Sequence, residues 1–345
     1  MTKQIMVGGV PIGGGAPVTI QSMTNTRTDD VEATLHQIRT LAAAGCEIIR
    51  VAVPDMAAAK AVGKIKESSP IPVVVDIHFD YKLALEAIAA GADKVRINPG
   101  NIGGADHVKA VAQACARRGV PIRIGVNGGS LEKPLLAKYG GVCPEAMVES
   151  AFGHIRLLNQ FDFDDICVSL KSSSVPMTMK AYQLMSQASD YPLHIGVTEA
   201  GTVRMGTLKS AVGIGGLLAL GIGDTMRVSL SADPVEEVYA AKEILKAAGV
   251  RKEGAELVSC PTCGRTRIDL IALANEVEER LKTVDKPITV AVMGCVVNGP
   301  GEASAADCGI AGGVGGGLLF KKGQIVKKVP QEQLVEELFA LIDTL

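Results

Sequence analysis

Short apolar runs and longer amphipathic stretches alternate along the first 250 residues of the chain. The runs are rich in valine and isoleucine, which is typical of strands that are buried on both faces. The stretches between them carry apolar residues at helical spacing, as in residues 30–45 and 81–92. Eight strands are predicted in this way, at residues 17–23, 46–53, 72–79, 94–100, 121–128, 165–172, 193–200 and 225–231.

Eight strand-and-helix units in about 250 residues predict an α/β fold of the (β/α)8 or TIM barrel type. Glycines end several of the predicted helices, at Gly45, Gly91, Gly119 and Gly249. A doubly wound parallel sheet is the alternative. It is less favoured, because the Gly-x-Gly-Gly of residues 213–216 lies inside a helical stretch and does not follow a strand.

The connection between the fifth and sixth predicted strands is longer than the others. It spans 36 residues, from 129 to 164. Extra length at one end of a barrel is typical of a loop that covers an active site, but an ordinary insertion explains it equally well.

An α+β pattern follows residue 250. A strand leads into a Cys-x-x-Cys pair, an amphipathic helix covers residues 267–284, and a second strand covers residues 287–298. Residues 317–329 predict a hairpin that turns at Lys322 and Gly323, and Pro330 starts the last helix. We therefore expect two domains, a barrel over residues 1–250 and a small cysteine-centred domain over residues 251–345.

The composition excludes several classes of function. The net charge of −2 favours neither nucleic acid nor an anionic membrane, and aromatic residues make up only 3% of the chain, with no tryptophan. The first 15 residues lack the apolar core of a signal peptide, and the apolar run at 212–223 is short and broken by glycines. We expect a cytoplasmic protein, in which Cys46, Cys115 and Cys167 are small buried side chains rather than halves of disulfides.

Cations occupy places in the predicted strands where an ordinary barrel has apolar residues. Five strands carry one near the carboxyl end, namely Arg50, Arg96, Arg123, Lys171 and Arg227. For any single one of these cations, a structural ion pair inside the barrel is an alternative explanation. Burying five without partners is costly, so the set predicts an anionic ligand with two or more phosphates at the end of the barrel where such enzymes act.

Polar and acidic residues accompany these cations. Side chains two or four residues along a strand point to the same face, which groups Asn98 with Arg96, Asn127 with Arg123 and Ser229 with Arg227. Asp76 and His78 form another such pair, and Glu199 ends the seventh strand. His78 and Glu199 are the candidate acid and base groups, whereas His36, His107 and His154 fall on predicted helices and are expected at the surface.

Three cysteines and a carboxylate in the second domain form a metal-site pattern. Cys260 and Cys263 form the pair, Cys295 follows at the end of a strand, and Glu302 comes seven residues later. This spacing favours an iron–sulfur cluster with one exchangeable iron. A zinc site, with Cys308 as a fourth thiolate, and reduced cysteines without metal remain open.

A barrel that binds phosphates and a redox cluster together indicate reduction of a phosphorylated compound. Five segments carry a more specific resemblance: VDIHFDY (75–81), VRINPGN (95–101), GVTEAGT (196–202), SCPTCGRT (259–266) and MGCVVNGPGE (293–302). With these segments, and over essentially its whole length, the chain resembles the 4-hydroxy-3-methylbut-2-en-1-yl diphosphate synthases of the non-mevalonate isoprenoid pathway, in their short two-domain bacterial form.

The resemblance implies a reaction and a site. The family opens and dehydrates 2-C-methyl-D-erythritol 2,4-cyclodiphosphate with two electrons. It implies a [4Fe–4S] cluster on Cys260, Cys263, Cys295 and Glu302, with Cys308 as a bystander. It also implies that Glu199, Asp76 and His78 are catalytic, and that the substrate is bound by Arg50, Arg96, Asn98, Arg123, Asn127, Lys171, Arg227, Ser229 and Asn298.

Partners follow from the resemblance as well. It implies a homodimer whose cluster domain caps the barrel of the other subunit, and a ferredoxin or flavodoxin as electron donor. Lys321, Lys322, Lys327 and Lys328 are candidates for docking an acidic carrier, or form a solvated hairpin face. Two rivals remain: a phosphate-binding barrel enzyme with a structural zinc tail, and a cluster-bearing sensor with an inactive barrel.

Overall fold

The computed structural model describes residues 1–252, 254–295 and 305–345. The chain divides into two compact units, Met1–Val250 and Arg251–Leu345. Each unit has its own hydrophobic core.

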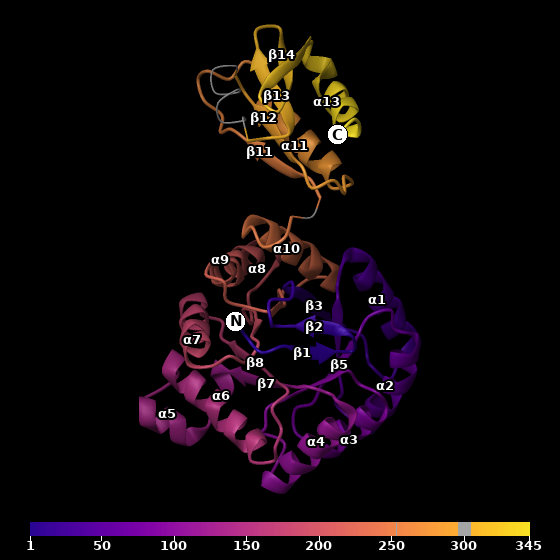
Figure 1. The fold of residues 1–345 in the computed structure, drawn as a ribbon, viewed down its shortest axis with the longest axis vertical. Helices are drawn as coiled ribbons and strands as arrows, with labels where there is room; N and C mark the ends of the chain where they lie inside the picture. The colour runs from indigo at the N-terminus through magenta and orange to yellow at the C-terminus, as the bar shows by residue number, and fades with distance from the viewer. Residues whose placement is uncertain (253, 296–304) are drawn as a thin grey trace. The chain divides into compact units, whose positions relative to one another are not determined.

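The first unit is a parallel eight-stranded barrel, as predicted. Its strands follow the order β8-β7-β6-β5-β4-β3-β10-β9, and a parallel bridge between Val168 and Leu193 joins the two ends. Helices surround the strands (Figure 1). All eight predicted runs contain a strand: β3 Thr19–Met23, β4 Ile48–Ala52, β5 Val73–Asp76, β6 Lys94–Ile97, β7 Ile122–Asn127, β8 Ile166–Lys171, β9 His194–Ile195 and β10 Thr225–Met226.

The barrel helices begin and end where the local chemistry of the sequence predicts. Aspartates at the starts of α1, α2 and α3 accept hydrogen bonds from the first-turn N–H groups. Gly45 and Gly119 end α1 and α4 in the left-handed conformation. The helices are α1 Val31–Ala44, α2 Met56–Ser68, α3 Tyr81–Ala89, α4 Ala105–Arg118, α5 Lys133–Tyr139, α6 Pro144–Asn159, α7 Val175–Ala188, α8 Val203–Ser210, α9 Gly216–Ala219 and α10 Pro234–Ala247.

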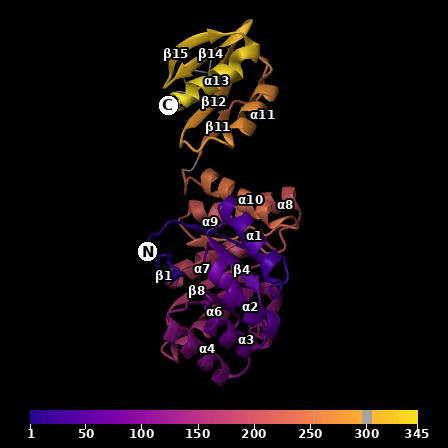
Figure 2. The same ribbon diagram turned by 90° about the vertical axis from the view of Figure 1, so that its right-hand side faces the viewer.

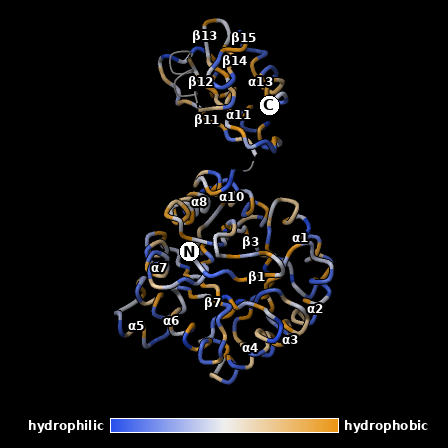
Figure 3. The backbone as a smooth tube through the Cα atoms, viewed as in Figure 1, coloured by the Kyte–Doolittle hydropathy of each residue, from blue (hydrophilic) through white to orange (hydrophobic). Residues whose placement is uncertain are grey.

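Apolar side chains fill the layer between these helices and the strands. Every second strand residue faces outward, among them Ile49, Val75 and Ile124, and packs with the inner faces of the helices. Figure 2 shows the helices wrapped around the strands, and Figure 3 shows polar and apolar segments alternating along α1 to α4. The other strand residues face into the barrel, which is where the predicted site residues lie.

An N-terminal hairpin that the sequence pattern did not predict covers one end of the barrel. Its strands, β1 Ile5–Val7 and β2 Val10–Ile12, pair antiparallel and lie across the barrel in Figure 1. Ile5, Val7 and Ile12 pack on inward-facing residues near the starts of β4, β5 and β8. The hairpin therefore closes the amino-terminal end of the barrel, and the carboxyl ends of the strands form the mouth.

The second unit is a five-stranded mixed sheet with helices on one face. The strand order is β11-β12-β13-β14-β15, and β11, β12 and β13 are parallel. Helices α11 and α13 pack on the face that includes Val290, Val292 and Ile310. The elements are β11 Glu256–Ser259, α11 Leu270–Leu281, β12 Thr289–Met293, β13 Cys308–Gly313, β14 Gly316–Lys321, β15 Gln324–Val329 and α13 Leu334–Asp343.

The predicted hairpin is present as β14 and β15, and it turns at Lys322 and Gly323, both with positive φ. The sequence pattern missed β13, a glycine-rich strand. Among the helices in the described part of the chain, none is long and apolar enough to cross a membrane.

Candidate functional site

Strand alternation brings the predicted cations together inside the barrel. Arg96 and Arg123 lie opposite each other on adjacent strands, and Asn127 lies opposite Lys171. Six predicted site residues are at least nine-tenths buried although each is charged or polar: Arg50, Asp76, Arg96, Asn98, Arg123 and Lys171.

Asp76 is the anionic centre of this group. Its carboxylate accepts a 3.0 Å hydrogen bond from Arg96 Nη1 and lies 3.7 Å from both Arg50 Nε and His78 Nε2. Burial by itself would raise the pKa of Asp76, but the nearby guanidinium groups of Arg50, Arg96 and Arg123 outweigh it and lower the pKa to about 2. Asp76 is therefore a fixed anion that orients two arginines, and it is too weak a base to take up a proton at neutral pH.

Arg227 has a partner that sequence reasoning missed. Glu237, a buried residue on α10, accepts hydrogen bonds of 3.1 Å from Arg227 Nε and Nη2. The same carboxylate also accepts from Leu230 N and the Ser22 hydroxyl. The local sequence pattern does not distinguish Glu237 from the other glutamates of this amphipathic helix. The pairing with Arg227, ten residues earlier in the chain, could therefore not be predicted from it.

Positive charge in the mouth exceeds the negative charge around it. Five cations face two buried carboxylates, those of Asp76 and Glu237. Within the described part of the chain, Arg123 Nε and Nη1 have no hydrogen-bond partner. Burial and repulsion from Arg96 lower the pKa of Arg123 to about 10, and burial and repulsion from Arg123 lower that of Lys171. A bound polyanion would relieve both effects.

Two glycines make room for these long side chains inside the barrel. A Cβ atom on Gly125 would collide with the Arg96 guanidinium, and one on Gly196 would lie 2.7 Å from Lys171 Nζ. Gly125 lies on β7, next to the strand that carries Arg96, and Gly196 directly follows β9, next to the strand that carries Lys171. A larger residue at either position would displace one of these two cationic side chains.

The remaining predicted residues of the barrel lie at its rim. Glu199 is exposed and follows β9 with a φ of 53°, a left-handed conformation that is costly for a residue other than glycine. His78 is exposed beside Asp76. Asn127 and Ser229 are half-buried.

A second polar layer lies deeper in the barrel and was also missed. Lys94 precedes Arg96 by two residues on the same strand face and is fully buried. Burial and repulsion from Arg123 lower the pKa of Lys94 to about 8. Within the described residues, neither Lys94 Nζ nor His194 Nε2 has a hydrogen-bond partner. The two-residue strand period could have identified Lys94.

Within the long connection after β7, a buried histidine of α6 contacts the start of an extra helix, α5. Glu132 at that start lies 2.9 Å from His154 Nε2. The prediction of a surface position for His154 is wrong, because only 6% of the residue is exposed and burial lowers the pKa of its imidazole. In contrast, Cys46, Cys115 and Cys167 are buried as predicted.

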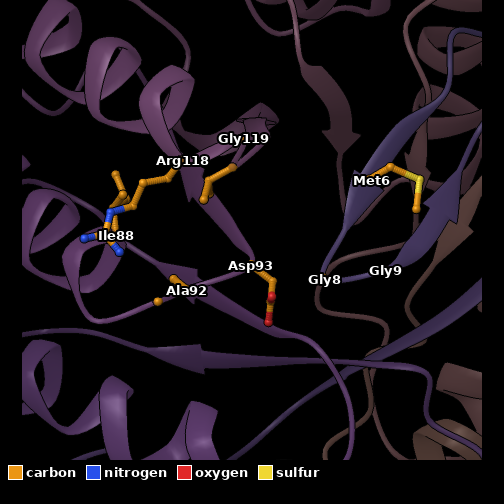
Figure 4. Close-up of a pocket in the computed structure, with 10 residues that line it drawn as sticks. Met6, Gly8, Gly9, Ile88, Ala92, Asp93, Arg118 and Gly119 are labelled. Atoms are coloured by element: carbon orange, nitrogen blue, oxygen red, sulfur yellow. The ribbon is translucent and has the colours of Figure 1, made fainter.

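A pocket of about 440 Å³ lies away from the mouth. Met6, Gly8 and Gly9 of the hairpin line one side, and Asp93 and Arg118 lie on the other (Figure 4). Asp93 bonds Lys66 Nζ and Val73 N, each at 2.8 Å, so its carboxylate already has structural partners.

Two cysteines of the second unit, Cys260 and Cys295, lie at one end of its sheet. β11 and β12 are adjacent and parallel, so Cys260 and Cys295, which follow them, lie near the carboxyl ends of neighbouring strands. Gly294 N donates a 3.1 Å hydrogen bond to Cys260 Sγ. An N–H group aimed at sulfur stabilises a thiolate, which is the form that binds iron.

Cys263 lies in the turn between Cys260 and α11. It is exposed, and hydrogen bonds from the backbone and side chain of Arg265 lower the pKa of its thiol. Thr266 N bonds to Cys263 O, and Arg267 N bonds to Gly294 O, which ties this turn to the end of β12. The turn thus presents a third thiol of the predicted ligand set, and the lowered pKa of Cys263 favours its thiolate form.

Cys308 is not part of this group. It starts β13 opposite Val290 and is fully buried in the core on the helix side. Burial raises the pKa of its thiol to about 11. Cys295 lies five residues beyond Val290, a span of up to about 16 Å along the direction of β12. A four-cysteine zinc site that includes Cys308 does not fit this sheet.

Among the described residues, no three His, Cys, Asp or Glu side chains stand close enough together to hold a metal ion. The predicted ligand Glu302 and the predicted substrate contact Asn298 lie outside the described residues. The thiols of Cys260, Cys263 and Cys295 are suitable ligands for an iron–sulfur cluster. Cys260 and Cys295 lie at the same end of the sheet, and a backbone N–H group donates to the sulfur of Cys260.

Solved structures share the barrel fold. An N-acetylneuraminic acid synthetase from Leptospira borgpetersenii matches 82% of this chain and 98% of its own, with a TM-score of 0.52 and 15% identity. A dihydropteroate synthase from Coxiella burnetii matches 72% of this chain and 98% of its own, with a TM-score of 0.51 and 13% identity. At these identities the likeness concerns the fold alone.

Sequence comparisons reach much closer relatives. Residues 2–242 match the GcpE TIM-barrel domain, and residues 256–344 match the GcpE protein C-terminal domain. The "4-hydroxy-3-methylbut-2-en-1-yl diphosphate synthase (flavodoxin)" of Geobacter sulfurreducens is 62% identical over 99% of this chain and 97% of its own length. The protein of the same name from Ruminiclostridium cellulolyticum is 60% identical over 98% and 96%. These matches confirm the predicted resemblance, and the chain belongs to the GcpE family of 4-hydroxy-3-methylbut-2-en-1-yl diphosphate synthases.

Proposed function

We propose that this protein reduces 2-C-methyl-D-erythritol 2,4-cyclodiphosphate to 4-hydroxy-3-methylbut-2-enyl diphosphate. The reaction consumes two electrons and two protons, opens the ring at a C–O bond and releases one water. The observation that carries the proposal is the excess of positive charge in the mouth of the barrel, where Arg123 Nε and Nη1 have no hydrogen-bond partner among the described residues. A diphosphate supplies the missing negative charge.

The barrel residues bind the substrate and move its protons. Arg50, Arg96, Arg123, Lys171 and Arg227 hold the diphosphate, with Asn98, Asn127 and Ser229 as neutral hydrogen-bonding groups. Asp76 keeps Arg50 and Arg96 in place through the contacts described above. The first turn of α8, which follows β9, offers backbone N–H groups to a phosphate oxygen, because the side chain of Thr202 does not accept a capping hydrogen bond from them.

Glu199 is the proposed proton donor to the departing oxygen. Its carboxylate is exposed at the rim, and its left-handed backbone fixes its position in the segment that follows β9. His78, hydrogen-bonded into the Asp76 and Arg96 pair, orients the substrate or relays a proton.

Cys260, Cys263 and Cys295 would hold a [4Fe–4S] cluster, with Glu302 as the fourth ligand. When bound, such a cluster supplies the two electrons and a Lewis-acidic iron. Gly294 N donates a hydrogen bond to Cys260 Sγ, and hydrogen bonds from Arg265 lower the pKa of Cys263.

The remaining parts of the proposal concern partners and location. Electrons come from flavodoxin, the donor printed in the names of the relatives. The active unit is a homodimer in which the cluster domain of one subunit serves the barrel of the other. Cluster thiols need a reducing compartment, so we place the enzyme in the cytoplasm.

Metal analysis of protein purified without oxygen tests the proposal. We expect about four irons and four acid-labile sulfides per chain, and turnover of the cyclodiphosphate with dithionite. One zinc per chain without sulfide would overturn it in favour of a phosphate-binding barrel with a zinc tail. Iron and sulfide with diphosphate binding but no turnover would instead support a sensor.

A further inference from the structure

The four candidate docking lysines of the second unit do not form one patch. Lys321 lies opposite Cys308, which lies opposite Val290 at the start of β12. The turn at Lys322 and Gly323 is therefore at the far end of the sheet from the cysteines. Lys327 forms an ion pair of 2.6 Å with Glu337 on α13, so its charge is already neutralised.

Lys328 stands at the cysteine end instead. One row of paired residues runs across the sheet from Lys328 on β15 through Leu318 on β14 and Ala311 on β13 to Met293 on β12. Met293 precedes Cys295 by two residues. Lys328 is exposed. Three rows of strand register separate its partner Leu318 from Lys321 on β14, which is about 10 Å at the usual rise of a strand.

The turn between β13 and β14 lies at the same end. Gly312 packs so closely on the Gly294 carbonyl that it has no room for a Cβ atom. Gly294 is adjacent to Cys295 and donates to Cys260 Sγ. Two residues after Gly312, Val314 forms the tip of the turn with 85% of its surface exposed. The backbone of this turn is thus in direct contact with the segment that carries the cysteines.

Charge and apolar surface at this end suit a transient protein contact. Val314 provides an exposed apolar point, and Lys328 and the exposed Arg265 flank the cysteine end with positive charge. An apolar centre with a charged rim is typical of such interfaces, and the positive rim favours an acidic partner. Electron transfer weakens steeply with distance, so a carrier has to dock near the cysteines.

We propose that the turn of Gly312, Val314 and Gly316, together with Lys328, is the surface on which the acidic electron carrier, a flavodoxin, docks. The proposal rests on the reductase function proposed above. It replaces the hairpin turn at Lys322 as the docking point, because that turn lies at the wrong end of the sheet.

Charge substitutions in the full-length, cluster-loaded enzyme test this surface. Lys328→Glu, alone and as the double variant with Val314→Asp, is compared with Lys322→Glu, which places the same reversal as Lys328→Glu at the opposite end of the sheet. Both substituted regions are exposed, so folding and iron content are expected to stay as in the parent. Turnover is measured with reduced flavodoxin at several ionic strengths, and separately with dithionite, which needs no docking surface.

We expect the double variant to raise the KM for flavodoxin about tenfold and to reduce its salt dependence. Its rate with dithionite should match that of the parent, and Lys322→Glu should change the KM for flavodoxin less than about twofold. An equal effect of Lys322→Glu, an unchanged KM in the double variant, or an equal loss with dithionite would each overturn the proposal. A parent enzyme without turnover under either reductant would instead contradict the proposed function.

Discussion

Glu199 combines an exposed carboxylate with a backbone conformation that glycine would adopt more easily. Its φ of 53° lies in the left-handed region, which costs about 1–2 kcal/mol for a residue with a Cβ atom. Such strain persists where a particular side chain is needed at a particular point. The strain supports the acid role proposed for Glu199 independently of sequence resemblance.

Two substitutions at this residue separate strain from chemistry. Glu199→Gln should keep the stability of the parent and lose turnover by about 10²–10⁴-fold, because the amide cannot donate the proton. Glu199→Gly should lose turnover equally but gain up to about 1 kcal/mol, since relief of strain exceeds the added chain freedom of glycine. Initial rates and urea unfolding measure both. A Gln variant with parental activity would remove Glu199 from the proposed chemistry.

Lys94 makes stability depend on pH. Its pKa in the folded chain is about 8, below its value of 10.5 in the unfolded chain, so the unfolded state binds more protons between these values. The destabilisation is full below about pH 8 and disappears as the pH rises towards 10.5. Lys94→Met should therefore raise the free energy of unfolding on the order of 2 kcal/mol at pH 7, and less at about pH 9.5.

Thermal unfolding at the two pH values measures this difference. The exposed Lys64 on α2 provides the matched control, because Lys64→Met removes the same charge from the surface. A stabilisation by Lys94→Met that does not change with pH would contradict the argument from the pKa of Lys94.

At the scale of elements, parallel pairing decides which cysteines can share a metal. β11 and β12 run side by side in the same direction, so the residues after both strands meet at one edge. Cys308 enters the same sheet at the opposite end, in the core beneath α11 and α13. Two cysteines 13 residues apart in sequence are thus separated by nearly the length of a strand.

A pair of cysteine variants distinguishes these places. Cys295→Ser should lose most of the bound iron and sulfide, because it removes one of three thiolates. Cys308→Ala should keep the metal and cost about 1 kcal/mol of stability as a small cavity in the core. Iron and sulfide content with far-ultraviolet circular dichroism measures both effects. Equal metal loss in the two variants would place Cys308 at the site.

At the scale of the whole molecule, the proposed function requires two compact units to contribute to one reaction. α10 ends at Ala247 and β11 begins at Glu256, so the linker of about eight residues spans at most about 28 Å. The last helix of a barrel unit runs antiparallel to its strands and ends away from the mouth. A second subunit that provides its cluster domain removes this limit on reach.

Mixed dimers test the shared site. Glu199→Gln chains and Cys295→Ser chains should each be inactive alone. Co-expressed and purified as mixed dimers through two different tags, they should recover about a quarter to a half of the parental rate, because one of two sites is intact. Mass spectrometry establishes that the purified dimers contain both chains. Mixed dimers without activity would count against the shared site.

Much of this architecture was predictable from local pattern. The alternation of apolar runs predicted all eight barrel strands, and the two-residue period placed Arg96, Arg123 and Lys171 on inward faces where the structure has them. The N-terminal hairpin and β13 were not predicted, because three-residue strands and a glycine-rich strand carry little periodicity. His154 was misplaced because its partner, the half-buried Glu132, comes from another element.

The sequence by itself determined the fold class, the family, the ring of cations and the Cys-x-x-Cys pair, since each depends on spacing within one segment or on a motif. Only the tertiary structure decided the partners between segments. Glu237 of α10 neutralises Arg227, Asp76 orients Arg50 and Arg96, and Lys328 and Lys322 fall at opposite ends of one sheet. The physical reason is that strand order and register decide which distant residues meet, and no local period along the chain encodes them.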